Sequence, residues 1–77
     1  MIKTVTDMKG RHYRVDQVLT TEQAAKAQVY PGHTTLYLTR VEDRGSYHMG
    51  LTIPRWLAME WVGGRIRVAV SLPEDIE

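Results

Sequence analysis

The sequence predicts an α+β domain, a small and mostly antiparallel sheet with two short helices in the order β-β-α-β-β-α-β. Three observations support this fold class. Apolar and polar residues alternate over several short segments, which is typical of half-buried strands. Alanines are concentrated in residues 24–28, which favours a helix. Pro54 suits the first position of a second helix, because the N–H that proline lacks would have no partner there.

Two strands and a capped helix are expected in the first half of the chain. Residues 2–6 and 11–19 alternate between apolar and polar, and Gly10 in the turn between them can take a positive φ, so these segments should form a hairpin. Thr20 and Gln23 fit a capping box, in which Thr20 caps the helix and Gln23 reaches back to it. The alanine-rich helix is therefore expected to begin directly after Thr20.

The second half shows a further hairpin, the second helix and a last strand. Residues 34–41 are rich in Thr, Leu, Tyr and Val, which favour strands. The polar residues 42–45 connect this strand to residues 47–53, which show the clearest alternation in the chain. After the second helix, apolar residues alternate again over residues 65–70, and this pattern predicts the last strand. Pro73 is expected to end the regular structure.

The length of 77 residues indicates one small domain, assigned to residues 1–73 with an acidic, frayed tail over residues 74–77. Such a domain has a small core, so homodimerisation or a tight partner would stabilise it. The chain has no cysteine, no signal-peptide pattern and no apolar run that would cross a bilayer. We therefore expect a cytoplasmic protein with no membrane partner.

The net charge of +1 conceals an asymmetry. The tail carries Glu74, Asp75 and Glu77, and without these three residues the remainder would carry +4. A nucleic-acid-binding domain is usually more basic than this. The charge therefore permits nucleic-acid binding but does not by itself predict it.

The second helix contains both tryptophans. At roughly 100° per residue, Ala58 and Trp61 share one face, whereas Trp56 and Met59 fall outside it, beside Arg55. One interpretation is that both tryptophans lie in the core. The other is that Arg55, Trp56 and Met59 form an interface, with a second copy or with a foreign protein, because Trp and Arg are over-represented among binding hot spots.

The outward face of the predicted sheet carries basic and aromatic residues. Alternation places Arg14, Tyr37, Arg65 and Arg67 on it, together with His12 and His48. Arginines and an aromatic ring on a sheet can contact phosphates and stack a base, which makes a nucleic-acid surface one interpretation. A solvated face without a ligand is the other.

No motif predicts catalysis or a cofactor. The three histidines fall on separate predicted elements without metal-site spacing, and Gly63-Gly64 alone is no phosphate loop. Asp16, Glu42 and Asp43 lie where strand ends and turns are expected, so they do not indicate acid–base chemistry. We therefore expect a non-enzymatic protein without a metal or a cofactor.

One block of the second half resembles the core of AbrB-type swapped-hairpin transcription factors and related antitoxins. The block consists of residues Leu51 to Pro54, the predicted second helix, and residues Gly63 to Val68. The shared pattern is a strand ending in Ile-Pro, a short helix, a glycine turn and a second short strand. The resemblance implies two interlaced chains and DNA contacts from arginines that precede the Ile-Pro strand. By position, these would be Arg40 and Arg44.

The favoured hypothesis is a non-enzymatic protein-binding module that docks on a macromolecular partner and blocks it sterically, with Trp56 as anchor. In size and composition the chain resembles small bacteriophage proteins that inhibit host machinery, including anti-CRISPR inhibitors, and this resemblance implies a bacterial host complex as target. The alternatives are an AbrB-like DNA-binding regulator or antitoxin, with Arg65 and Arg67 as additional contacts, and a purely structural homodimer.

Overall fold

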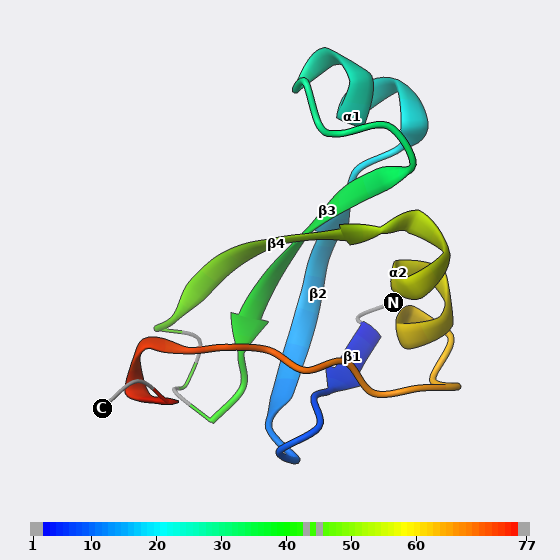
Figure 1. The fold of residues 1–77 in the computed structure, drawn as a ribbon. Helices are drawn as coiled ribbons and strands as arrows, with labels where there is room; N and C mark the ends of the chain where they lie inside the picture. Colours follow the sequence, from blue (N-terminus) through cyan, green and yellow to red (C-terminus); the bar gives the residue numbers. More distant parts are fainter. Residues whose placement is uncertain (1–2, 43, 45, 76–77) are drawn as a thin grey trace.

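The computed structural model describes residues 3–42, 44 and 46–75, and it confirms the α+β fold class (Figure 1). Its four-stranded sheet has the order β1-β2-β3-β4, and every neighbouring pair is antiparallel. Two α-helices and a short 3-10 helix, η1, complete the described secondary structure. The elements are β1 (Lys3–Thr6), β2 (His12–Val18), α1 (Thr21–Lys26), β3 (His33–Arg40), β4 (His48–Pro54), α2 (Arg55–Val62) and η1 (Pro73–Asp75).

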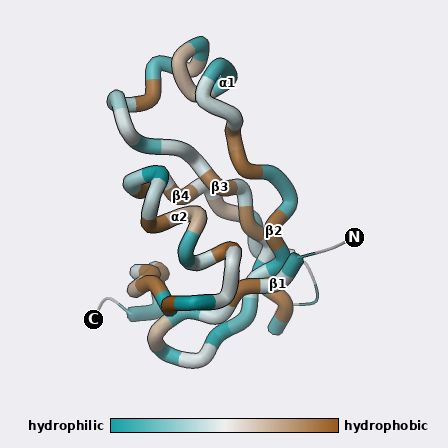
Figure 2. Tube along the Cα trace, turned by 90° about the vertical axis from the view of Figure 1, so that its right-hand side faces the viewer, coloured by the Kyte–Doolittle hydropathy of each residue, from teal (hydrophilic) through white to brown (hydrophobic). Residues whose placement is uncertain are grey.

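Local sequence signals account for the first turn and for the start of α1. The predicted capping box is confirmed: the N–H of Gln23 donates to Thr20 Oγ1 at 3.1 Å, and the N–H of Thr20 donates to Gln23 Oε1 at 2.9 Å. Gly10 takes a φ of 84° between β1 and β2. Figure 1 and Figure 2 both show α1 at one end of the molecule. In the described ranges, neither α1 nor any other helix combines the length and apolar character needed to cross a membrane.

One face of the sheet is apolar and covered, and the other is polar and open. Tyr13, Leu36 and Leu38 are completely buried on the covered face. Arg14 and Tyr37 are exposed on the open face, as the alternation predicted.

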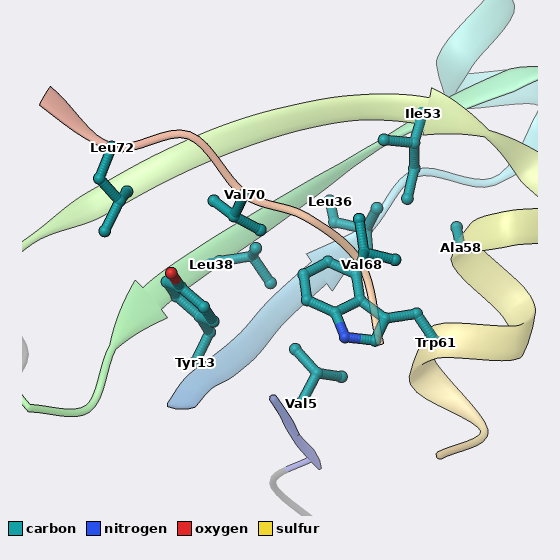
Figure 3. Close-up of a cluster of buried hydrophobic side chains, with 10 residues drawn as sticks. All are labelled: Val5, Tyr13, Leu36, Leu38, Ile53, Ala58, Trp61, Val68, Val70 and Leu72. Atoms are coloured by element: carbon teal, nitrogen blue, oxygen red, sulfur yellow. The ribbon is translucent and has the colours of Figure 1, made fainter. Parts of the chain in front are cut away.

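Trp61 lies at the centre of the core under the covered face (Figure 3). Its indole N–H donates to the carbonyl oxygen of Thr6 at 2.8 Å, so the one polar atom of the side chain has a partner. Its ring packs edge-on against Tyr13, with ring centroids 6.4 Å apart. The buried cluster consists of Val5, Tyr13, Leu36, Leu38, Ile53, Ala58, Trp61, Val68, Val70 and Leu72.

The segment after α2 differs from the predicted last strand. Residues 66–70 do not join the sheet but form only an isolated parallel bridge, between Asp7 and Val68. Their apolar side chains nevertheless cover the sheet, and Figure 3 shows Val68, Val70 and the following Leu72 pointing into the core. The alternation therefore arises because an extended segment buries every second residue, without pairing as a strand.

A charged cluster holds this C-terminal segment in place. Arg11 donates through Nε to Asp7 Oδ2 at 2.8 Å, and through its two terminal nitrogens to the carboxylate of Asp75 at 3.1 and 3.2 Å. The same guanidinium donates to the carbonyl oxygen of Val70 at 2.8 Å. We call Asp7, Arg11 and Asp75 the Arg11 clamp. It ties the turn between β1 and β2 to the segment that leads into η1.

The surroundings of the Arg11 clamp keep both of its carboxylates ionised at neutral pH. Burial of Asp7 opposes ionisation, but hydrogen bonds from the Tyr13 hydroxyl at 2.7 Å and from Arg11 outweigh burial and lower the pKa of Asp7. A hydrogen bond from the backbone N–H of Leu72, together with those from Arg11, holds the pKa of Asp75 well below its usual range. Burial, and then the hydrogen bond to Asp7, raise the pKa of Tyr13.

The first two residues of the expected acidic tail belong to the folded part. Glu74 pairs with Arg40, and Asp75 pairs with Arg11 and, at 3.2 Å, with Lys9. These residues were expected to fray after Pro73, but ion pairs with distant parts of the chain hold them. Glu77, the third acidic residue of the tail, lies outside the described residues.

We expect Asp75→Asn to lower the free energy of unfolding at neutral pH, because the variant loses the charge that pairs with Arg11. A carboxylate with a lowered folded-state pKa stabilises the fold above its unfolded pKa, and this contribution is lost as the pH falls. The difference between wild type and variant should therefore shrink below pH 3.8, the ordinary pKa of aspartate. Urea unfolding at several pH values measures this.

The matched control for this prediction is Glu22→Gln, which removes an exposed carboxylate whose ion-pair partner in the described part of the chain is Lys26 of the same helix. Its unfolding should match that of wild type at every pH. A deficit of Asp75→Asn that persists unchanged at acid pH would contradict the assigned role of the charge.

We expect Tyr13→Phe to cost about 1–3 kcal/mol of stability, because the buried carboxylate of Asp7 loses the hydroxyl that donates to it. The phenyl ring retains the packing against Trp61. Tyr30→Phe, at a side chain that is 73% exposed, serves as control and should leave the urea midpoint unchanged. Equal midpoints for both variants would contradict the prediction.

Candidate partner-docking surface

α2 follows β4 without a loop, and this connection fixes where the helix begins. Pro54 ends β4 and is also the N-cap residue of α2. The sequence predicts Pro54 at the first helical position, so the helix begins one residue later than predicted. The N–H of Arg55 donates to the carbonyl oxygen of Gly32 at 2.8 Å, which anchors the first turn to the loop before β3. At the other end, the N–H of Gly63 donates to the carbonyl oxygen of Met59 at 2.9 Å.

Burial of Trp61 determines how α2 is rotated. Trp61 and Ala58 are each only 1% exposed, and both point into the core (Figure 3). Trp56 precedes Trp61 by five positions, which at 3.6 residues per turn is roughly 140° around the helix. Trp56 therefore cannot reach the core while Trp61 occupies it, and its side chain is 67% exposed. The structure thus places Trp61 in the core and Trp56 on the surface.

The three predicted partner-binding residues lie together at the start of α2, and we call Arg55, Trp56 and Met59 the α2 patch. Trp56 and Met59 are three positions apart, so they are neighbours on the helix surface, and Met59 is 50% exposed. An indole ring and a flexible thioether side chain thus form an apolar surface next to a guanidinium group.

Arg55 is a cation without a carboxylate partner among the described residues. Its terminal nitrogen donates to the carbonyl oxygen of His33 at 3.0 Å, and no described Asp or Glu lies within ion-pair distance. Beside it, a hollow of about 300 Å³ is lined by α1, by the loop that follows α1 and by Arg55 itself. Tyr30 lines this hollow, is 73% exposed, and contacts the ring of His33. The neighbourhood of the α2 patch is therefore aromatic and basic.

The structure does not gather the residues expected to contact nucleic acid into one surface. Arg14 and Tyr37 share the open face of the sheet, but Arg14 donates to Asp16 at 2.7 Å. Arg65 follows α2 and pairs with Glu60 at 2.6 Å. The guanidinium groups of Arg14 and Arg65 already have carboxylate partners. The negative charge of these partners weakens the attraction that either arginine would exert on a phosphate.

The other three arginines on which nucleic-acid binding was predicted lie elsewhere. Arg40 is opposite Tyr13 in the sheet and pairs with Glu74. Arg44 is exposed in the turn between β3 and β4, where its φ is 54°. Arg67 is exposed in the segment after α2. The six candidates are therefore distributed over the open face, the end of β3, the turn between β3 and β4, and the segment after α2.

Sequence reasoning missed a polar network on the open face. Thr39 Oγ1 donates to Asp16 Oδ2, lies 2.9 Å from His48 Nδ1, and accepts from Arg14 at 3.3 Å. Hydrogen bonds from Thr39 and then Arg14 lower the pKa of Asp16. Thr39 is only 2% exposed, so its hydroxyl joins three strands rather than facing a substrate. No described group of three His, Asp or Glu residues is arranged to hold a metal ion.

We expect Trp56→Phe to remove the quenchable part of the tryptophan fluorescence. The remaining emission would come from Trp61, which is buried, so it should shift to shorter wavelength and resist iodide. Met8→Ala, at another exposed apolar side chain, should leave both properties unchanged. Emission that stays fully quenchable in Trp56→Phe would show that Trp61 is accessible.

Comparison of the chain with protein-family models, with curated proteins and with solved structures finds no match.

Proposed function

We propose that this chain is a non-enzymatic protein-binding module that docks on a macromolecular partner through the α2 patch and blocks the surface it covers. One observation carries the proposal: α2 has eight residues and two tryptophans, of which Trp61 is 1% exposed and Trp56 is 67% exposed. The core explains why Trp61 is present. It does not explain Trp56, because the rotation of the helix excludes that side chain from the core.

The energetics of burial make Trp56 a suitable anchor. A tryptophan buries about 150–250 Å² when it becomes enclosed. At about 25 cal/mol per Å² of apolar surface, covering the exposed part of Trp56 would stabilise a complex by roughly 3 kcal/mol. Met59, one turn along the helix, can adapt its unbranched side chain to the surface around the indole ring.

Arg55 gives the α2 patch a preference for an acidic partner. Arg55 is half-buried, and no described carboxylate lies within reach of its guanidinium group. A carboxylate on the partner would satisfy the free N–H groups at the moment when the neighbouring indole ring excludes water. The proposed partner surface therefore offers an apolar pocket for Trp56 with an Asp or Glu side chain at its rim.

The proposed mode of action is steric occlusion. A small, compact domain that docks through one helix would cover a functional surface of its partner without chemistry of its own. The resemblance in size and composition to small phage inhibitors, including anti-CRISPR inhibitors, supports a bacterial host complex as the target class.

The test is an affinity pull-down from bacterial lysate, divided into nuclease-treated and untreated halves, followed by binding measurements with the purified partner. We expect one protein to be retained stoichiometrically in both halves. Trp56→Ala should weaken binding roughly 30-fold, the equivalent of a hot spot of about 2 kcal/mol. The variant should fold normally, because the lost side chain is exposed.

Met8→Ala is the matched control, since Met8 is 65% exposed and lies outside the α2 patch. It should bind like wild type. Capture that depends equally on both residues, or not at all on Trp56, would contradict the proposal. Retention of nucleic acid that nuclease removes, with an affinity that falls steeply as salt rises, would favour a DNA-binding regulator instead.

A further inference from the structure

β4 is an edge strand whose outer side has no partner among the described residues. The strand order places β4 at the end of the sheet, beside β3 only. At the opposite end of the sheet, the bridge from Val68 to Asp7 partly covers the chain just after β1. No described backbone or side chain forms a comparable hydrogen bond with the outer edge of β4.

The register identifies the backbone groups that point outward. The N–H of Arg40 donates to the carbonyl oxygen of Tyr47 at 2.9 Å, so Tyr47 bonds toward β3. In an antiparallel pair the bonding direction alternates along the strand. His48, Gly50 and Thr52 therefore direct their N–H and C=O groups away from β3, to the free edge.

The edge lacks the features that usually prevent strands from pairing. β4 is seven residues long, and none of its residues is Lys, Arg, Asp or Glu. Its proline is the last residue, where it does not interrupt the edge. The register shift in the sheet lies between β2 and β3, away from β4.

We propose that a second copy of this chain pairs with β4, antiparallel and about a two-fold axis at Gly50, so that two sheets become one. In this register Gly50 faces Gly50 of the second copy, and His48 faces Thr52 of the second copy. Every outward N–H and C=O group of the three residues then finds a partner, whereas a shift of the axis leaves some of them unpaired. This interface is separate from the α2 patch.

The side chains of β4 are complementary to themselves in the same register. On the covered side of the sheet, Met49 would face Leu51 of the second copy; both are apolar and only partly buried in the single chain. No charged side chain of β4 would face a like charge across the axis. Two-fold symmetry pairs one surface with itself, so a neutral edge that is complementary about its centre fits a second copy.

Position 50 offers a direct test, because the proposed axis brings its two copies together. A Cβ added to Gly50 would lie 3.4 Å from the ring of Tyr37, an ordinary contact distance, so a side chain can be accommodated on the open face. Gly50→Lys and Gly50→Glu should each lose the dimer through repulsion between like charges. An equimolar mixture of the two variants should restore it. Gly50→Ala is the neutral control and should still dimerise.

Sedimentation velocity over a range of concentrations, together with amide hydrogen exchange, measures these outcomes. Wild type should dimerise as the concentration rises, and exchange at His48, Gly50 and Thr52 should slow at the same time. A wild-type chain that stays monomeric at high concentration would overturn the proposal. So would a dimer that survives Gly50→Lys, or one that disappears with Trp56→Ala, which would assign the interface to the α2 patch.

Discussion

The guanidinium group of Arg11 connects the turn between β1 and β2 to the C-terminal segment that covers part of the core. The sheet has an apolar face wider than one eight-residue helix can cover, and the remaining cover comes from the irregular segment that contains Val68, Val70 and Leu72. That segment has almost no backbone pairing of its own. Burial of these three side chains holds it, together with ion pairs and hydrogen bonds from Arg11 to Asp75 and to the carbonyl oxygen of Val70.

Ion pairs of the C-terminal residues also reduce, in the folded molecule, the charge asymmetry that the sequence shows. Counted along the chain, the acidic residues near the end leave a basic body and an acidic tail. In the folded molecule Glu74 and Asp75 return to Arg40 and Arg11, so the tail neutralises cations that the body could have presented to an acidic ligand. Arg55, beside the exposed Trp56, is one of the cations that this folding leaves without a carboxylate partner among the described residues.

The features that could be predicted from the sequence are those that depend on neighbouring residues. Alternation identified the strands and their faces, the capping box located the start of α1, and helical spacing separated the faces of Trp56 and Trp61. Alternation could not distinguish a paired strand from the extended segment over residues 66–70, because both bury every second side chain. The Arg11 clamp joins residues 64 positions apart, and the network around Thr39 spans three strands, so neither leaves a local signal.

The distance along the chain between Arg11 and Asp75 also bears on the order in which the molecule assembles. Closing a loop of this length costs chain entropy, and this cost arises before the contacts of Arg11 contribute any favourable free energy. The two hairpins close much shorter loops. The hairpins and α2 can therefore form before the C-terminal segment docks, and we expect this segment to open first when the native state fluctuates. Its release would expose the indole ring of Trp61 to water while the four strands remain paired.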